Sequence, residues 1–195
     1  MIASIILAAG ASSRMGSPKA LLEYRGETFI GRMVRVYAEL CAPVIVVLGY
    51  HAAAIRPAIP NTATIVTNPQ PEHGQLSSLQ TALAELPADA EGFLFAPVDS
   101  PAIQPPTVEM LAAEFRRRDP ATVFVIPRYR GKHGHPVFAA RAIAEEMLAL
   151  PATAQARDIV HRHVARTRYI DVEDSGILTD VDDPAAYRQL TENAR

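Results

Sequence analysis

The sequence predicts a three-layer α/β fold, in which helices cover both faces of a mostly parallel, doubly wound sheet. Short runs of Val, Ile, Leu and Phe alternate along the chain with segments whose apolar residues have helical spacing. Strands that are apolar on both faces are typical of parallel sheets buried between helices. With 195 residues, about half of them apolar, the chain can bury one sizeable core, and we expect a single domain over residues 1–195.

The elements follow one another in α/β order. In the first half we predict strands over 4–9, 43–50, 63–68 and 92–99, and helices over 28–40 and 74–86. In the second half we predict helices over 105–118, 139–150 and 156–165, and strands over 122–127 and 168–172. In such sheets ligands bind beyond the carboxyl ends of the strands, so the loops that follow the strands are the expected place for chemistry.

Composition excludes several classes of partner. The formal net charge is −2, whereas a general nucleic-acid binder is usually basic, so no nucleic-acid partner is expected. No apolar stretch reaches about 18 residues, so no membrane span is expected. The single cysteine, Cys41, cannot form an internal disulfide and reads as a small core residue. A reducing, cytoplasmic location fits this cysteine usage.

The loop after the first strand, within "LAAGASSRMGSPKALL", combines small residues with two cations. The four residues Gly10–Ser13 let the backbone approach a ligand closely and offer N–H donors. Arg14 and Lys19 add positive charge. Bare amides beside an arginine and a lysine are suited to a triphosphate. A polar surface loop with incidental charges is the alternative interpretation.

Spacing excludes two better-known phosphate loops. Walker A requires G-x-x-x-x-G-K-[ST], but here Gly10 and Gly16 are six apart and Ser17 and Pro18 precede the lysine. The dinucleotide fingerprint G-x-G-x-x-G is absent because position 12 is serine.

The same stretch resembles L-A-A-G-x-S-x-R-M-G-x-x-K-x-L, the signature of the MobA-like NTP transferases, and among them the molybdenum cofactor cytidylyltransferases. The resemblance implies a Rossmann-like sheet of the nucleotide-diphospho-sugar transferase type. It implies that Arg14 and Lys19 hold the triphosphate and are catalytic. It also implies nucleotide contacts from Leu7, Ala8, Ala9, Gly10, Ala11, Ser12 and Ser13. Guanylyl-transferring relatives tend to read L-A-G-G, so Ala9 favours cytidine.

The segment "NPQPEHGQLSSLQTAL" carries a second match to the family, an asparagine followed by a glycine and serines that open a helix. Gly74 allows a close turn, and Ser77 and Ser78 lie in the first helical turn, where N–H groups are free. The resemblance implies that these residues and Asn68 contact the nucleobase and ribose. Simple helix capping is the alternative.

The segment "LFAPVDSPAI" places Asp99 at the carboxyl end of an apolar strand. A carboxylate near a triphosphate is repulsive unless a cation lies between them, so Asp99 is expected to bind Mg²⁺ and to be catalytic. Capping of the helix near Pro105 is the alternative, but Asp99 lies too early for it. Ser100 is a candidate contact for the acceptor.

The segment "TDVDDPAAY" resembles the closing D-x-D-T-P segment of the family. Asp180 and Asp182 share one face if the segment is extended, and both are candidate Mg²⁺ ligands, with Asp182 preferred. Asp183 replaces the threonine of the family and can instead cap a final helix that begins at Pro184.

The segment "GKHGHPVF" resembles G-x-x-G-H-P-V of the cytidylyltransferase branch. His135 is therefore a candidate contact for the acceptor phosphate or pterin, and a structural hydrogen bond is the equal alternative.

The implied reaction is Mg²⁺-dependent transfer of CMP from CTP to the phosphate of a molybdopterin cofactor, with release of pyrophosphate. A molybdenum enzyme or its chaperone is an implied protein partner. Two alternatives stay open: cytidylyl or guanylyl transfer to another small phosphorylated acceptor, such as a sugar or polyol phosphate, and a non-catalytic protein that binds nucleotide or delivers cofactor.

Overall fold

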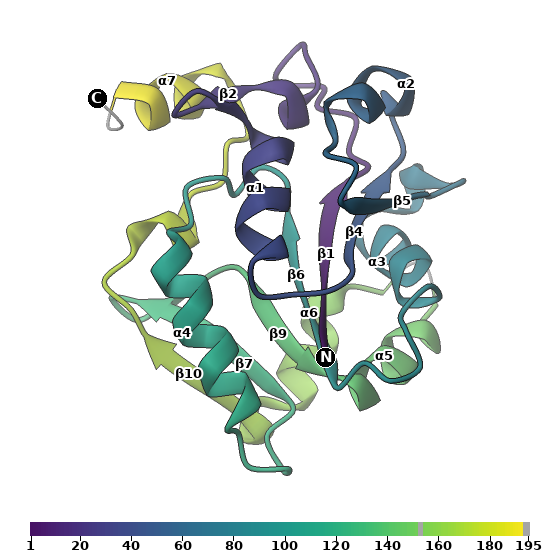
Figure 1. Cartoon of the computed structure of the whole chain (residues 1–195), viewed down its shortest axis with the longest axis vertical. Coiled ribbons are helices and arrows are strands. Elements are labelled where there is room, and N and C mark those ends of the chain that lie inside the picture. The colour runs from purple at the N-terminus through teal and green to yellow at the C-terminus, as the bar shows by residue number, and fades with distance from the viewer. Residues whose placement is uncertain (152–153, 193–195) are drawn as a thin grey trace.

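The computed structural model describes residues 1–151 and 154–192, and its central feature there is one eight-stranded sheet (Figure 1). The strand order is β10-β7-β9-β6-β1-β4-β5, and β8 pairs with β7. The strands are β1 (Ile2–Ala8), β4 (Val44–Leu48), β5 (Ala63–Thr67), β6 (Gly92–Pro97), β7 (Phe124–Tyr129), β8 (Lys132–His133), β9 (Val137–Ala140) and β10 (Thr167–Asp171). A separate hairpin is formed by β2 (Glu23–Tyr24) and β3 (Glu27–Thr28).

Most of the pairings in the sheet are parallel. β1 pairs in parallel with β4 and β6, β4 with β5, and β7 with β10. β9 is the exception, because it runs antiparallel to both β6 and β7. Its first residue, Val137, therefore pairs with Phe95 near the carboxyl end of β6. The segment before β9 consequently reaches the edge of the sheet where the parallel strands end.

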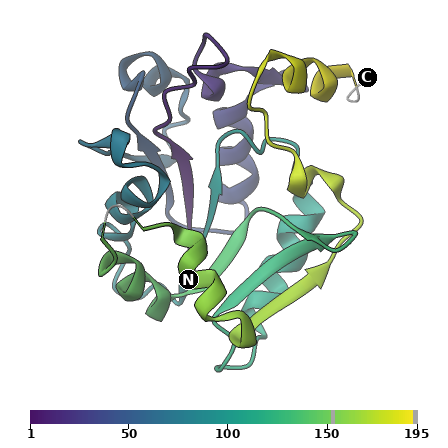
Figure 2. The same cartoon turned by 180° about the vertical axis from the view of Figure 1, so that it is seen from behind.

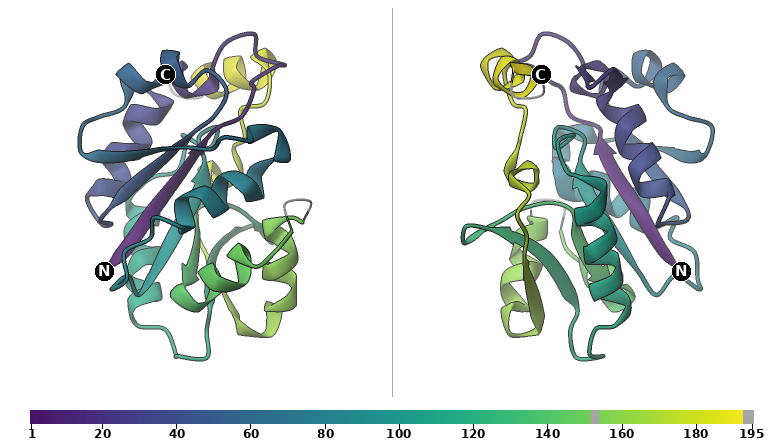
Figure 3. Two further views of the ribbon diagram at one scale, coloured as in Figure 1. Left: turned by 90° about the vertical axis from the view of Figure 1, so that its right-hand side faces the viewer. Right: turned by 60° about the vertical axis from the view of Figure 1, so that its left-hand side comes forward.

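Helices cover both faces of the sheet (Figures 2 and 3). α1 (Phe29–Ala38) and α4 (Pro105–Arg116) pack on one face, and α3 (Gln75–Leu83), α5 (Arg141–Leu148) and α6 (Ala156–Arg162) on the other. The side chains of β1 alternate between these two layers, so that Ile6 joins the α1 side and Ile5 and Leu7 the α3 side. Burial on both faces explains the continuous apolar run of this central strand.

The remaining helices surround the carboxyl edge of the sheet. α2 (Ala52–Ile55) follows β4, and α7 (Pro184–Glu192) lies beside the β2–β3 hairpin (Figure 1). The Tyr187 hydroxyl donates to the Glu23 carbonyl at 2.9 Å, which ties α7 to the hairpin. Single 3₁₀ turns span Lys19–Leu21, Arg56–Ala58, Pro71–His73, Val164–Arg166 and Ser175–Leu178.

The predicted fold class is confirmed, and so is each predicted strand and helix, with shifted ends. The helix expected over 139–150 was wrong at its start, because residues 139 and 140 belong to β9 and α5 begins at Arg141. The sequence pattern also missed β9, α2, β8 and the β2–β3 hairpin, which have two to four residues each and are too short for a periodic signal. Within the described ranges, the helices are all too short or too polar to cross a membrane.

Candidate active site

A cleft of about 270 Å³ opens at the carboxyl edge of the sheet, beside β1 and β6. Figure 2 shows the loop after β1 and the segment before α7 at this same end of the molecule. Most of the predicted nucleotide-contacting residues line the cleft together with both predicted cations and two of the predicted carboxylates. These lining residues are Leu7, Ala8, Ala9, Gly10, Ser12, Ser13, Arg14, Lys19, Gly74, Ser78, Asp99 and Asp182.

The loop after β1 is held in shape by Ser12. Its hydroxyl oxygen accepts a hydrogen bond from the Lys19 N–H at 3.1 Å, and its carbonyl accepts one from the Met15 N–H at 3.0 Å. Gly10 is exposed, and a Cβ placed on it would meet no atom within 4 Å. Packing in the protein therefore does not require glycine at this position. Because Gly10 also lines the cleft, its bare backbone leaves room for a close approach by a ligand.

Lys19 lies at the centre of the charged part of the cleft. Its Nζ lies 2.8 Å from Asp99 Oδ2 and 2.7 Å from Asp182 Oδ1. Arg14 reaches Asp182 from the solvent side, with 3.1 Å between its guanidinium and Oδ2. The side chain of Lys19 is 13% exposed and that of Arg14 is 66% exposed. The lysine pairing is therefore the better shielded from water and the stronger of the two.

The pairing also shifts the proton affinities of its members. Burial opposes the charged form of Lys19, but the hydrogen bonds to Asp182 and Asp99 outweigh it and raise the pKa of the ammonium. The hydrogen bond from Lys19 lowers the pKa of Asp182, against a smaller effect of burial. Lys19 and Asp182 are therefore both charged near neutral pH.

Backbone hydrogen bonds bring Asp99 and Asp182 together, although the two residues are 83 positions apart in the sequence. The Val98 N–H donates to the Leu7 carbonyl at 3.0 Å, and the Val181 N–H donates to the Asp99 carbonyl at 2.9 Å. Val181 is fully buried in the core, so the carboxylates on either side of it face away from the core.

Asp180 has a different environment from Asp182. It accepts a hydrogen bond from the buried Ser100 hydroxyl at 3.0 Å and lines a neighbouring cavity of about 430 Å³ beside α7, not the main cleft. Burial raises the pKa of Asp180, and the hydrogen bond from Ser100 opposes that rise. Asp183 caps α7 by accepting from the Ala185 and Ala186 N–H groups at 2.9 Å each, as the alternative interpretation predicted.

Gly74 precedes α3 with φ of 93°, a conformation that favours glycine, and the helix N-terminus faces the cleft at Gly74 and Gln75. Asn68 lies behind it and is buried, with its amide donating to the hydroxyls of Ser77 and Ser78 at 2.9 and 3.0 Å. Both serines donate back to the Gly74 carbonyl rather than capping the helix. Asn68, Ser77 and Ala11 lie outside the lining of the cleft.

His135 lies on the β6 side of the edge, in the segment that precedes β9. Its ring meets that of Phe95 edge-on, with 6.4 Å between the ring centres, and its Nδ1 is buried without a hydrogen-bond partner among residues 1–151 and 154–192. Burial lowers the pKa of His135, although the nearby carboxylates of Asp180 and Asp99 partly oppose this shift. The imidazole is therefore neutral at pH 7 and keeps one nitrogen for a ligand or water.

The sequence pattern did not reveal a second layer of contacts that holds the first loop. Gly49 packs so closely on Ala9 that a Cβ would lie 2.9 Å from the Ala9 methyl. The Tyr50 N–H donates to the Ala9 carbonyl at 3.2 Å, and His51 Nε2 lies 3.0 Å from the Ala11 carbonyl. We call Gly49–His51 the brace. The contacts of the brace depend on the pairing of β1 with β4, so they cannot be predicted from the spacing of residues within one segment.

The sequence analysis also did not single out Arg32, which is buried in α1 beside the apolar residues of that helix. Its guanidinium donates to the Pro101 carbonyl at 2.9 Å and lies over the Tyr24 ring. It thereby fixes the turn that follows Asp99.

The donor atoms of the cleft fit a hard divalent cation. Asp99 and Asp182 offer carboxylate oxygens close enough to share one ammonium. Across residues 1–151 and 154–192, no group of three or more His, Cys, Asp or Glu side chains is placed to hold a metal ion. Mg²⁺ does not require such a group, because it usually takes one or two carboxylates together with substrate phosphates and water.

An edge that offers amides and cations to a polyanion, and carboxylates to a divalent cation, is typical of enzymes that act on nucleoside triphosphates. Comparison with known proteins agrees: the chain belongs to the MobA-like NTP transferase domain family, which matches residues 4–167. It is therefore a nucleotidyltransferase.

Two curated relatives match almost the whole chain. The molybdenum cofactor cytidylyltransferase of Escherichia coli is 25% identical over 92% of this chain and 90% of its own length. A probable molybdenum cofactor guanylyltransferase of Pelotomaculum thermopropionicum is 28% identical over 98% of this chain and 94% of its own length.

Among solved structures, the Mycobacterium tuberculosis protein Rv0371c superposes with a TM-score of 0.86 at 32% identity, covering 98% of this chain and 97% of its own. A second structure of that protein, a complex with manganese, has a TM-score of 0.82 at 30% identity over 98% of both chains. These likenesses agree with the fold and with a divalent cation in a relative.

Proposed function

We propose that this protein transfers CMP from CTP to the phosphate of a molybdopterin-type acceptor and releases pyrophosphate, with Mg²⁺ as cofactor. One observation carries the proposal: Lys19, Arg14, Asp99 and Asp182 converge beside the open backbone of Gly10 in one cleft. Membership of the MobA-like family supports the reaction type. The cytidylyltransferase among the curated relatives supports the acceptor class.

The nucleotide is bound by the β1 side of the cleft. The backbone of Gly10, Ser12 and Ser13 and the N-terminus of α3 at Gly74 and Gln75 face the triphosphate, because these residues line the cleft. The first N–H groups of a helix have no partner within the helix and suit an anion. Arg14 and Lys19 neutralise the charge that builds on the leaving pyrophosphate. Asn68, Ser77 and Ser78 fix the start of α3 through their mutual hydrogen bonds, and of these three Ser78 also lines the cleft.

Asp99 and Asp182 are the proposed ligands for Mg²⁺. When bound, the cation supplies Lewis-acid stabilisation of the phosphoryl oxygens. We assign Asp180 a supporting role, because its carboxylate is bonded to Ser100 and lines the neighbouring cavity.

The acceptor phosphate attacks the α-phosphorus in line, and the bond to pyrophosphate breaks. A phosphomonoester has a second pKa near about 6, so the nucleophile is already ionised at neutral pH and needs no strong base. Catalysis therefore depends on position and on charge neutralisation. His135, with its buried unpartnered Nδ1, and the adjacent Ser100–Asp180 pair are the proposed acceptor contacts.

Ala9 supports CTP over GTP. Ala9 lines the cleft and its methyl group packs against Gly49, and we propose that a glycine at this position would leave more room for a larger base. We further propose that the protein works in the cytoplasm, where its buried free thiol at Cys41 stays reduced, and hands its product to a molybdenum enzyme or its chaperone.

The test is a pyrophosphate-release assay with CTP, GTP, ATP and UTP, each with Mg²⁺, against molybdopterin loaded with molybdenum, a sugar phosphate and a polyol phosphate. We expect release only with the molybdopterin acceptor and fastest with CTP. Activity confined to a sugar or polyol phosphate would replace the acceptor in the proposal. Tight CTP binding without release or exchange of pyrophosphate would instead favour a non-catalytic nucleotide-binding protein.

A further inference from the structure

The cations and carboxylates of the cleft are paired with one another. Lys19 Nζ donates to Asp99 Oδ2 and to Asp182 Oδ1, and the Arg14 guanidinium pairs with the other carboxylate oxygen of Asp182, Oδ2. The formal charges of these four groups cancel. The groups proposed to hold the triphosphate are therefore engaged by the groups proposed to hold the metal.

A divalent cation and the Lys19 ammonium compete for the same oxygens. The two hydrogen bonds of 2.7 and 2.8 Å put Nζ between the carboxylates, where a shared metal ion would have to lie. Adding a divalent cation alone would also gather uncompensated positive charge beside two cationic side chains, which is unfavourable in a partly buried site. A metal ion by itself therefore meets both a steric and an electrostatic obstacle.

A triphosphate removes both obstacles. It carries several negative charges that can take over the contacts of Lys19 and Arg14. Lys19 is suited to such an exchange, because its backbone is fixed by the hydrogen bond to Ser12 while its flexible four-carbon stem lets Nζ move within the cleft. Arg14 is mostly exposed and can follow with little loss of packing.

We propose that Lys19 is a latch on the metal site: it holds the Asp99–Asp182 pair closed until a nucleoside triphosphate draws it away, so that divalent cation and nucleotide bind as a coupled pair. The inference rests on the proposed function and adds to it the order and coupling of the two ligands. Thermodynamic linkage makes the coupling reciprocal, so the metal ion must tighten nucleotide binding by the same factor as the nucleotide tightens metal binding.

The test is Mn²⁺ binding measured by electron paramagnetic resonance of the free ion, with and without a CTP analogue whose α,β-bridging oxygen is replaced by a methylene group. This analogue cannot be turned over, so binding is observed without activity. For the wild-type protein we expect the analogue to raise the Mn²⁺ affinity of the site roughly tenfold or more, beyond the Mn²⁺ that the analogue binds without protein, within the usual range of coupling between sites. The effect of Mn²⁺ on the affinity of the analogue, measured by calorimetry, is expected to match it.

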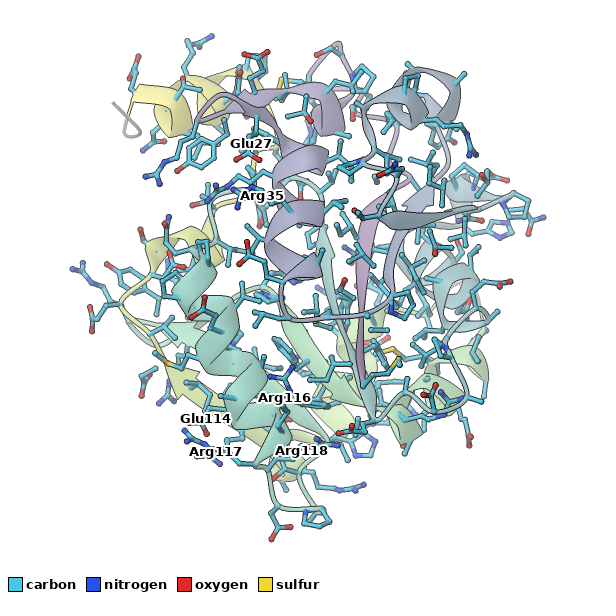
Figure 4. The ribbon with its side chains drawn as sticks, viewed as in Figure 1. Glu27, Arg35, Glu114, Arg116, Arg117 and Arg118 are labelled. Atoms are coloured by element: carbon cyan, nitrogen blue, oxygen red, sulfur yellow. The ribbon has the colours of Figure 1, made fainter. Side chains whose placement is uncertain are left out.

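Two substitutions of the latch separate charge from structure. Lys19→Gln removes the ammonium, so Mn²⁺ affinity without the analogue is expected to rise at least about fivefold and the coupling to shrink. Lys19→Arg keeps a cation and is expected to keep metal binding weak without the analogue. The matched control is Arg35→Gln, which removes a cation of α1 that pairs with Glu27 of β3 (Figure 4). Neither residue lines the cleft, so this variant is expected to bind Mn²⁺ like the wild type. Circular dichroism verifies that each variant is folded.

The latch is overturned if the wild type binds Mn²⁺ equally well with and without the analogue. It is also overturned if folded Lys19→Gln binds Mn²⁺ no better than Arg35→Gln, or if Mn²⁺ binds under none of these conditions. The proposed function stands or falls separately, because it is judged by pyrophosphate release and not by coupling. An active enzyme without coupling would reject the latch alone.

Discussion

The two sides of the carboxyl edge are built in different ways. On the side of β1, β4 and β5 all strands are parallel, and short backbone contacts such as Tyr50 N–H to Ala9 carbonyl and Asn68 N–H to Leu48 carbonyl join one loop to the next. On the side of β6, β9 and β7 the middle strand is reversed. On this side the segment before β9 reaches the carboxyl edge of the sheet and places side chains such as His135 there.

The difference suggests a division of labour. Under the proposed function, the side made of backbone amides and two cations would recognise what all nucleoside triphosphates share, and its small residues follow one another in a single loop. A side made of individual side chains from distant segments can vary with the acceptor while the sheet stays the same. The cluster of Lys19, Asp99 and Asp182 joins the two sides.

Substitutions in the cluster of Lys19, Asp99 and Asp182 are expected to have the largest effect on activity. Lys19→Ala or Asp99→Asn is expected to lower the turnover number by roughly a hundredfold or more, the scale on which a lost electrostatic partner affects a transition state. Steady-state pyrophosphate release measures it, with Arg35→Ala as a control from the outer surface of α1. Near-normal turnover in either variant would remove the cluster from the reaction.

Ala9 tests the specificity of the β1 side. Ala9→Gly is expected to shift the ratio of kcat/KM for CTP over GTP towards GTP by about tenfold, as one carbon atom in a fitted pocket commonly does. Competition between the two nucleotides in one assay gives the ratio directly. The KM for the acceptor is expected to stay unchanged. A change in the acceptor KM without a change in the nucleotide ratio would contradict the assignment of the nucleotide to the β1 side and the acceptor to the β6 side.

The brace gives a smaller effect on the same side. His51→Ala removes the contact with the Ala11 carbonyl and is expected to raise the KM for CTP roughly threefold to tenfold, the worth of one hydrogen bond, with little change in kcat. His51→Asn tolerates the positive φ of 59° and keeps an N–H donor, so partial recovery is expected. A fall in kcat alone, with KM constant, would contradict a role in holding the loop.

His135 gives the smallest effect, on the β6 side. Because its folded pKa is lowered, the unfolded chain binds a proton first as pH falls below about 6.5. The neutral His135 side chain therefore costs no stability above that pH. Below it, the free energy of unfolding falls by at most about 1.4 kcal/mol per pH unit for one proton.

Denaturant unfolding between pH 7.5 and 5 measures this loss, with Asp180 and Asp99 as the charged neighbours that moderate it. His135→Gln is expected to flatten the pH dependence. Equal pH profiles for His135→Gln and the wild type would show that the imidazole is not held neutral.

The fold could be predicted from the sequence where a signal was long. The apolar runs of β1, β4 and β6 are buried on both faces, and this burial is what produces their continuous pattern. β9 has only four residues and continues into the alanine-rich start of α5, so helical propensity hid it. The antiparallel insertion therefore appeared only with the tertiary pairing.

The candidate site follows the same rule. Arg14, Lys19 and Asp99 could be predicted because each lies in a loop that follows a strand, in a recognisable spacing. His51 and Arg32 could not, since their contacts with Ala11 and Pro101 arise from neighbouring elements and not from any local pattern. The pairing of Lys19 with both carboxylates was likewise beyond the sequence, which indicated the charges but not their mutual neutralisation.

The most direct test of nucleotidyl transfer at this cleft follows the α-phosphate itself. CTP labelled in its α-phosphate is incubated with Mg²⁺, molybdenum-loaded molybdopterin and the protein, and the products are separated by chromatography. We expect label to enter the cofactor together with cytidine, and Asp99→Asn to lower this transfer roughly a hundredfold or more. Label that remains in CTP with the wild-type protein, or that is transferred equally well by Asp99→Asn, would contradict this expectation.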